Sequence, residues 1–233
     1  VLIALIAGFF LYLFAKYGGE IRELRSSANR IVHSSTEEDF HEAETSFVYA
    51  VDGTLISTLK SDRDSYYLKA SEIPYNVKAA IVSIEDKKFY EHQGVDYRAI
   101  LRAVRAMIEN GEATQGGSTI TQQLARTIFL SNEKTWQRKV EEIYIASELE
   151  EKYSKEQILE FYLNNVYFAN GYYGIQAAAK GYFSKDISEL DLSQVCFLLA
   201  IPNSPTYYDP VVNPQNTITR RDLILAAMLK DKV

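Results

Sequence analysis

The chain has 233 residues, of which 47% are hydrophobic and 24% charged, a composition typical of a globular protein with one sizeable core. Its net charge of −6 and pI of about 5.2 give the chain as a whole no electrostatic reason to bind DNA or RNA. A single cysteine, Cys196, excludes an internal disulfide and a cysteine-based metal cluster, and the three histidines are too scattered to indicate a zinc site.

The N-terminal segment is apolar and predicts a membrane helix over residues 1–19. Its first fifteen residues carry no charge, whereas a full span needs about 20 apolar residues, so we expect the sequence to begin inside such a helix. A cleaved signal peptide is the alternative, but no small-residue cleavage motif follows. Residues 20–44 predict a juxtamembrane helix, continuous or kinked at Gly18-Gly19, and then an acidic linker over residues 35–44.

Residues 45–233 predict one mainly α-helical domain with a short β-hairpin at its start. Two β-rich runs flank Asp52-Gly53, a pair typical of a two-residue hairpin turn. Capping residues mark the starts of the helices that follow: Pro74, Asp96, Ser118 or Thr119, Ser154 with Gln157, and Asp191 with Gln194. The second of these helices should end at Asn110-Gly111 and turn its apolar side chains inward: Ile100, Leu101, Val104 and Ile108.

An acidic pair, Glu85 and Asp86, closes the helix that Pro74 opens, and Phe89 and His92 follow within one to two turns. A carboxylate at a helix end beside an aromatic side chain can act as a general base near neutral pH. Such a pair is also common on solvated surfaces, so the pattern alone does not establish a catalytic site.

The segment GGSTITQQ, residues 116–123, combines two glycines with two hydroxyls at a predicted helix start. Glycine lets backbone N–H groups approach a ligand closely, and a helix N-terminus favours an anion. Around it, residues 98–139 hold three acidic side chains and seven basic ones: Arg98, Arg102, Arg105, Arg126, Lys134, Arg138 and Lys139. This local charge of +4 predicts a pyrophosphate site, with a solvated helix face as the alternative.

Five segments follow one another in the order EDKKFYEHQG (85–94), GGSTITQQ (116–123), RKVEE (138–142), KEQILEFYLN (155–164) and RRDLIL (220–225). Together they resemble the motifs of the family 51 peptidoglycan glycosyltransferases, found in class A penicillin-binding proteins and monofunctional transglycosylases. The resemblance covers roughly residues 45–230. It implies a mainly α, lysozyme-like head domain with a smaller membrane-proximal jaw, on the outer face of the bacterial cytoplasmic membrane. It also implies polymerisation of lipid II into β-1,4-linked glycan strands, with inversion and release of undecaprenyl pyrophosphate.

The resemblance also implies roles for particular residues. Glu85 would be the general base, and Glu142 a second catalytic glutamate that orients cations or holds a divalent ion. The side chains implied to bind or support substrate are Asp86, Phe89, His92, Ser118, Thr119, Gln122, Gln123, Arg126, Lys134, Arg138, Lys139 and Asn164. Of these, Asp86, Phe89 and His92 are expected to shape the site. A Mg²⁺ or Mn²⁺ ion at the pyrophosphate is compatible with the resemblance, which requires none.

The partners implied are lipid II, the lipid-linked glycan strand and membrane lipid. Apolar residues between Tyr97 and Ala113 are expected to dip into the membrane. No transpeptidase motif set is present, so a C-terminal transpeptidase domain would lie outside this sequence. The nearest alternative is a lysozyme-like peptidoglycan hydrolase or lytic transglycosylase, which needs a glutamate but no pyrophosphate site. An inactive membrane scaffold is a further alternative.

Overall fold

The computed structural model describes residues 2–41, 46–59, 66–110, 117–131 and 133–233. In this part of the chain helices dominate, which confirms the mainly α-helical prediction. The elements, in chain order, are α1 (Leu2–Ser34), η1 (Glu37–Phe40), β1 (Ser46–Tyr49), β2 (Leu55–Leu59), α2 (Tyr75–Glu85), α3 (Tyr97–Asn110), α4 (Ile120–Phe129), α5 (Trp136–Lys152), α6 (Lys155–Asn165), α7 (Ile175–Phe183), η2 (Ile187–Glu189), α8 (Leu192–Leu199) and α9 (Pro214–Asp231).

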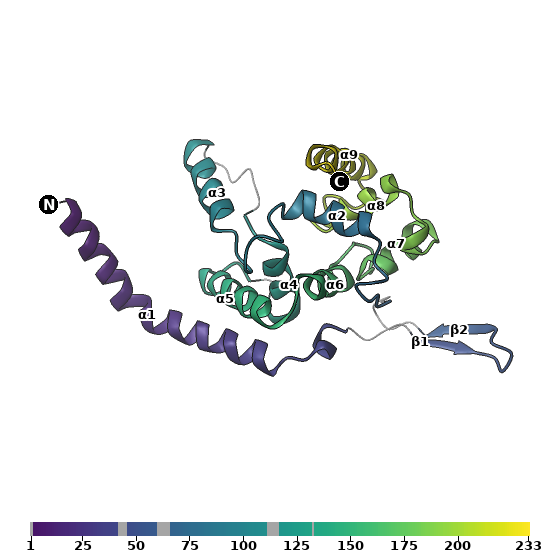
Figure 1. Ribbon diagram of the computed structural model, residues 1–233, viewed down its shortest axis with the longest axis horizontal. Coiled ribbons are helices and arrows are strands. Elements are labelled where there is room, and N and C mark those ends of the chain that lie inside the picture. The colour runs from purple at the N-terminus through teal and green to yellow at the C-terminus, as the bar shows by residue number, and fades with distance from the viewer. Residues whose placement is uncertain (1, 42–45, 60–65, 111–116, 132) are drawn as a thin grey trace.

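Helix α4 lies at the centre of the helical body, in contact with both α5 and α6. Its side chains Ile120, Leu124 and Ala125 are fully buried. Helix α2 contacts α8 and α9, which closes the other side of the body. Figure 1 shows α1 extending past α5 on one side, while the strand pair projects on the opposite side. The helices α2, α4 and α5 are therefore packed within one helical body.

Side-chain caps fix where the helices begin. The hydroxyl of Thr119, rather than Ser118, accepts the backbone N–H of Gln122, and the Gln122 side chain accepts the Thr119 N–H. Asp96 accepts the N–H of Ala99 at the start of α3. The reciprocal boxes of Ser154 with Gln157 and of Asp191 with Gln194 are both present. The predicted starts of these four helices are thus confirmed.

One glycine ties the start of α4 to the rest of the helical body. Gly94 has φ of +82°, and a Cβ there would lie 2.5 Å from the carbonyl oxygen of Ala146 in α5. Only glycine fits both the backbone conformation and this close approach. The Thr119 hydroxyl donates to the carbonyl of Gly94 at 2.6 Å. The turn after α2, the start of α4 and the middle of α5 therefore meet at this residue.

The inward-facing surface predicted for α3 is wrong where the structure describes it. Leu101 is 69% exposed and Ile108 79% exposed, while Ile100 is half-buried. The side chain of Val104 and all of Gly111 lie outside the described residues. Helix α3 projects from the body (Figure 1), so the described elements leave this apolar surface open.

In the N-terminal region the structure contains the continuous helix that was one of the two expectations, but it departs from the expected linker. Helix α1 runs without a break through Gly18-Gly19. The described part of the expected linker packs against the core, since Phe40 is fully buried and stacks on Phe161 with ring centroids 4.0 Å apart. Apolar contact explains the difference, because one aromatic side chain outweighs the acidic surroundings. Residues 42–45 lie outside the described part. Among the described helices, none combines the length and apolar character that crossing a membrane requires.

Strands β1 and β2 pair antiparallel, with a shift in register beside Tyr49. Their connection is longer than the two-residue turn expected at Asp52-Gly53. The N–H of Ala50 donates to the carbonyl of Thr54, and the N–H of Gly53 donates to the carbonyl of Ala50. The loop therefore has three residues, ending on Gly53 at φ +84°, a geometry in which a left-handed glycine follows a tight turn.

Candidate active site

Glu85, the last residue of α2, is held by polar side chains from three distant segments. Arg220 of α9 donates to its Oε1 at 2.7 Å, and Gln123 of α4 donates to its Oε2 at 3.0 Å. Asn203 approaches Oε1 at 3.5 Å. The Glu85 side chain is 10% exposed, so the carboxylate is fixed in orientation yet remains accessible. The polar contacts of Glu85 with Arg220 and Asn203 were not expected from the sequence.

The orientation of Gln123 is set from behind by Tyr162 of α6, whose hydroxyl donates to the Gln123 Oε1 at 3.1 Å. Burial, reinforced by the negative charge of Glu85, raises the pKa of Tyr162 well above its usual value. The phenol therefore keeps its proton and acts as the donor. With its oxygen engaged in this way, the Gln123 amide must present its N–H group to Glu85.

A second carboxylate, Glu142, organises the cations of α5. Its side chain is only 1% exposed. Arg138 donates to one oxygen at 2.5 Å, Lys139 pairs with the other, and both spacings are those of neighbours on one helix face. Lys139 also donates to the hydroxyl of Ser118 at 2.8 Å. The ammonium of Lys139 is thereby aimed at the start of α4.

The start of α4 connects the two carboxylate groups. Ser118 touches Lys139, and Gln123 touches Glu85. These two α4 contacts are five residues apart along the chain, which corresponds to roughly 10 Å across a helix start. A solvent-accessible carboxylate and a cation cluster thus lie around one short segment, and the geometry suits a substrate that carries both a hydroxyl to be deprotonated and an anionic group.

Comparison with known proteins identifies the family. A family model described as Transglycosylase matches residues 52–229. The chain belongs to the transglycosylase family. It is 37% identical over 232 residues, 99% of its length, to penicillin-binding protein 4 of Bacillus subtilis, and 49% identical over 158 residues, 68% of its length, to penicillin-binding protein 1F of the same organism. It spans 37% and 22%, respectively, of the lengths of these relatives.

The remaining basic residues of this transglycosylase-family chain do not form one patch. Arg126 lies on α4, near enough for its charge to act on Tyr162, and Lys134 is exposed just before α5. The other three arginines of the 98–139 stretch lie on α3 and are exposed: Arg98, Arg102 and Arg105. The predicted basic stretch is therefore divided into two parts. Its arginines on α3 are separate from Lys139, which contacts Ser118 just before α4.

Several of the residues that the resemblance implies for the site make contacts within the protein. Asp86 is buried and accepts the N–H of Ile120, while Phe89 is fully buried. Asn164 is also buried, and its amide clamps the backbone of Leu68 from both sides. His92 pairs with Asp86 at 2.9 Å. In the same way Thr119 and Gln122 use their side chains to cap α4. The contacts of Asp86, Phe89 and His92 fit the shaping role expected of them, while the internal hydrogen bonds of Asn164, Thr119 and Gln122 were not evident from spacing.

Three residues around Glu85 were not among the predicted site residues: Arg220, Asn203 and Tyr162. Arg220 belongs to the RRDLIL segment, yet two adjacent arginines leave open which one faces inward. Tyr162 matches the helical spacing of a core residue, which it also is. No pattern in the sequence singles out Asn203. Each of them reaches Glu85 or its partner only through the tertiary fold.

The donor set around Glu142 does not fit a divalent ion. Both of its oxygens are already taken by cations, and a metal would have to displace them against charge repulsion. Across the described residues, His, Cys, Asp and Glu side chains form no group of three or more able to hold a metal. The arrangement favours the interpretation that Glu142 orients Arg138 and Lys139.

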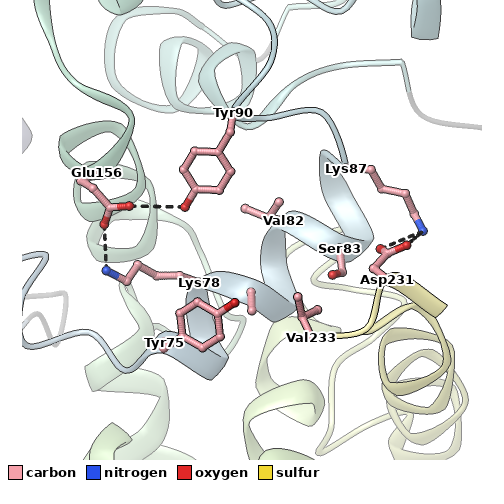
Figure 2. Close-up of a pocket in the computed structure, with 10 residues that line it drawn as sticks. Tyr75, Lys78, Val82, Ser83, Lys87, Tyr90, Glu156, Asp231 and Val233 are labelled. Carbon is pink, nitrogen blue, oxygen red and sulfur yellow. Dashed lines mark hydrogen bonds and ion pairs between the residues drawn. The ribbon is translucent and has the colours of Figure 1, made fainter. Parts of the chain in front are cut away.

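A separate cavity of about 520 Å³ lies on the outer surface of α2, and Figure 2 shows its lining. Lys78 pairs with Glu156 at one end, and Lys87 pairs with Asp231 at the other. Glu85 is not among the lining residues. Each lysine here has a carboxylate of its own, whereas Arg138 and Lys139 share Glu142, so this cavity offers a polyanion less positive charge.

Proposed function

We propose that this chain is a peptidoglycan glycosyltransferase that polymerises lipid II into β-1,4-linked strands, with inversion and release of undecaprenyl pyrophosphate. The observation that carries the proposal is the placing of Glu85 and Lys139 at one helix start through Gln123 and Ser118. Family membership and the names of the penicillin-binding relatives support it. The lysozyme-like head and the smaller jaw belong to this proposal.

On the acceptor side, Glu85 removes the proton from the sugar 4-hydroxyl while that oxygen attacks the anomeric carbon of the donor. Arg220 and Gln123 hold one carboxylate oxygen each, which fixes the direction from which the hydroxyl must approach. General-base assistance of this kind contributes roughly 10²- to 10⁴-fold in rate. The water-accessible edge of the carboxylate is where the acceptor sugar binds.

On the donor side, the pyrophosphate gains negative charge as the sugar bond breaks, and cations must stabilise it. An ammonium has three N–H donors. Within the described residues Lys139 uses two of them, for Glu142 and Ser118, so one is available to a phosphate oxygen. Arg138 lies next to it on α5, and Arg126 and Lys134 supply further charge. These residues bind the leaving group, while Ser118 completes the phosphate contacts.

Both substrates carry lipid chains, so the reaction takes place at a membrane surface. The exposed apolar residues Leu101 and Ile108 of α3, flanked by exposed arginines, form an amphipathic surface suited to an anionic bilayer. The uncharged N-terminal run of α1 is the second contact with lipid. We assign residues 1–19 to the membrane helix, 20–44 to the juxtamembrane segment and 45–233 to the catalytic domain, on the outer side of the bacterial cytoplasmic membrane.

The experiment is to incubate the protein with labelled lipid II and, separately, with purified sacculi. We expect glycan polymer from lipid II and no soluble fragments from sacculi. Fragments released from sacculi, without polymer from lipid II, would contradict the proposal and establish the hydrolase alternative. Repeating the lipid II reaction with EDTA tests the metal, and unchanged polymerisation is expected because Glu142 is already occupied by cations.

A further inference from the structure

A buried group of four ionisable side chains lies beneath the start of α4. It consists of Asp86 after α2, His92 in the following turn, Glu150 near the end of α5 and Lys155 at the start of α6. Asp86, His92 and Glu150 are all more than 90% buried as side chains. Burying charges in this way is costly unless each one is paired, so the arrangement requires an explanation.

Glu150 holds this group together. One of its oxygens accepts the hydroxyl proton of Thr121 at 2.5 Å and lies 3.7 Å from the Nδ1 of His92. The other oxygen pairs with Lys155 at 2.5 Å. Lys155 also donates to the carbonyl of His92 at 2.7 Å. Glu150 therefore contacts α4 directly, faces the ring of His92 and reaches the His92 backbone through Lys155.

His92 lies between the two carboxylates of this group. Its Nε2 donates to Asp86 at 2.9 Å, because a carboxylate can only accept. Its Nδ1 faces Glu150 at 3.7 Å, and among the described residues it has no hydrogen-bond partner. The ring is therefore fixed on one side by Asp86 and faces Glu150 on the other.

We propose that Glu150 is a positioning residue for Glu85, acting through His92 and Asp86 on the start of α4. Asp86 directly follows Glu85, and its carboxylate also accepts the N–H of Ile120 at 3.0 Å. Helix α4 in turn carries Gln123, which holds the Oε2 of Glu85. One buried network thus fixes both the backbone beside the base and the side chain that orients it. This inference rests on the proposed glycosyltransferase function.

The test is Glu150→Gln, which keeps the shape and the Thr121 contact but removes the charge. We expect kcat for lipid II polymerisation to fall about ten- to a hundred-fold, because small displacements of a catalytic group have effects of this size. KM should change less than about two-fold, since the α5 cations that bind pyrophosphate are untouched. Glu151→Gln, an exposed neighbour on α5, is the matched control and should behave as wild type. A purely structural role would lower the folded fraction and leave kcat per folded molecule unchanged.

A second readout needs no substrate. In the wild type, the side-chain amide of Gln123 should give an NMR signal typical of a bond to a carboxylate, and Glu150→Gln should shift it. With only three histidines in the chain, the ring signals of His92 can also be assigned, and they should shift in the variant because the charge that faces Nδ1 is removed. If Glu150→Gln fails to fold, Thr121→Val removes the contact with α4 alone and should give a smaller fall in kcat.

The outcomes separate the two proposals. An unchanged kcat together with an unchanged Gln123 signal would overturn the role of Glu150 and leave the glycosyltransferase function standing. Absence of polymer from the wild type would overturn that function, and the NMR comparison would still decide whether Glu150 positions the Glu85–Gln123 pair.

Discussion

Glu85 and Glu142 are both paired with arginine, but the fold builds their surroundings in opposite ways. Glu142 is 1% exposed and takes both of its partners from its own helix. Glu85 is 10% exposed and takes its partners from α4, α9 and residue 203. The enclosed carboxylate can organise cations but cannot meet a substrate hydroxyl, whereas the accessible one can. The different roles that we propose for the two glutamates therefore rest on exposure more than on charge.

The largest effect should come from Glu85→Gln, which tests the accessible half of this comparison. The amide keeps the size of the side chain but cannot accept the proton, so we expect polymerisation to fall by roughly 10²- to 10⁴-fold. The variant should still fold, with a lower unfolding temperature because Arg220 loses its charged partner, and binding of lipid II should stay close to wild type. Near-normal turnover in this variant would place the base elsewhere.

Glu142→Gln tests the enclosed half. Removing its charge leaves Arg138 and Lys139 to repel each other, and we expect the free energy of unfolding to drop by about 2 kcal/mol, a value moderated because Lys139 is partly screened by solvent. Affinity for a phosphate-bearing substrate mimic such as moenomycin should fall together with stability. Calorimetry and titration measure the two, and a loss of activity with neither change would contradict an organising role.

Lys139→Ala tests one of the cations held by Glu142 while the buried carboxylate itself stays in place. Because a charge-assisted hydrogen bond contributes about 1.5–3 kcal/mol, the affinity for moenomycin should weaken by about ten-fold or more. Lys78→Ala, in the cavity on the outer surface of α2 (Figure 2), is the control and should bind as wild type. Equal affinity in both variants would remove Lys139 from the pyrophosphate site.

The same contrast explains what could be predicted from the sequence. The surroundings of Glu142 could be predicted, because Arg138, Lys139 and Glu142 follow helical spacing. The caps of α4, α6 and α8 could also be predicted, because they follow known residue pairs. The surroundings of Glu85 could not, because Arg220 and Asn203 lie 135 and 118 residues away from it along the chain. The internal hydrogen bonds of Asn164 could not be predicted either, because a motif does not show which way a side chain points. Helix α3 was expected to be buried because amphipathic spacing cannot distinguish a core from another apolar partner.

The smallest effect concerns Cys196, which lies in the core away from both glutamates. Burial raises the pKa of Cys196 to about 11 from a model-peptide value of 9.0, so the thiol stays protonated in the folded chain. Its contribution to stability should be complete below pH 9 and be lost as the pH rises towards 11. Iodoacetamide at pH 8 should label the unfolded chain and spare the native one. Rapid labelling of native protein would show that this part of the core opens.

The most direct test of the central claim is a structure of the Glu85→Gln variant with a bound lipid II analogue. The account predicts the pyrophosphate within hydrogen-bonding distance of Lys139 and Ser118, and a sugar 4-hydroxyl beside the side chain at position 85. A pyrophosphate bound elsewhere, for example between Lys78 and Lys87 on the outer surface of α2, would contradict it.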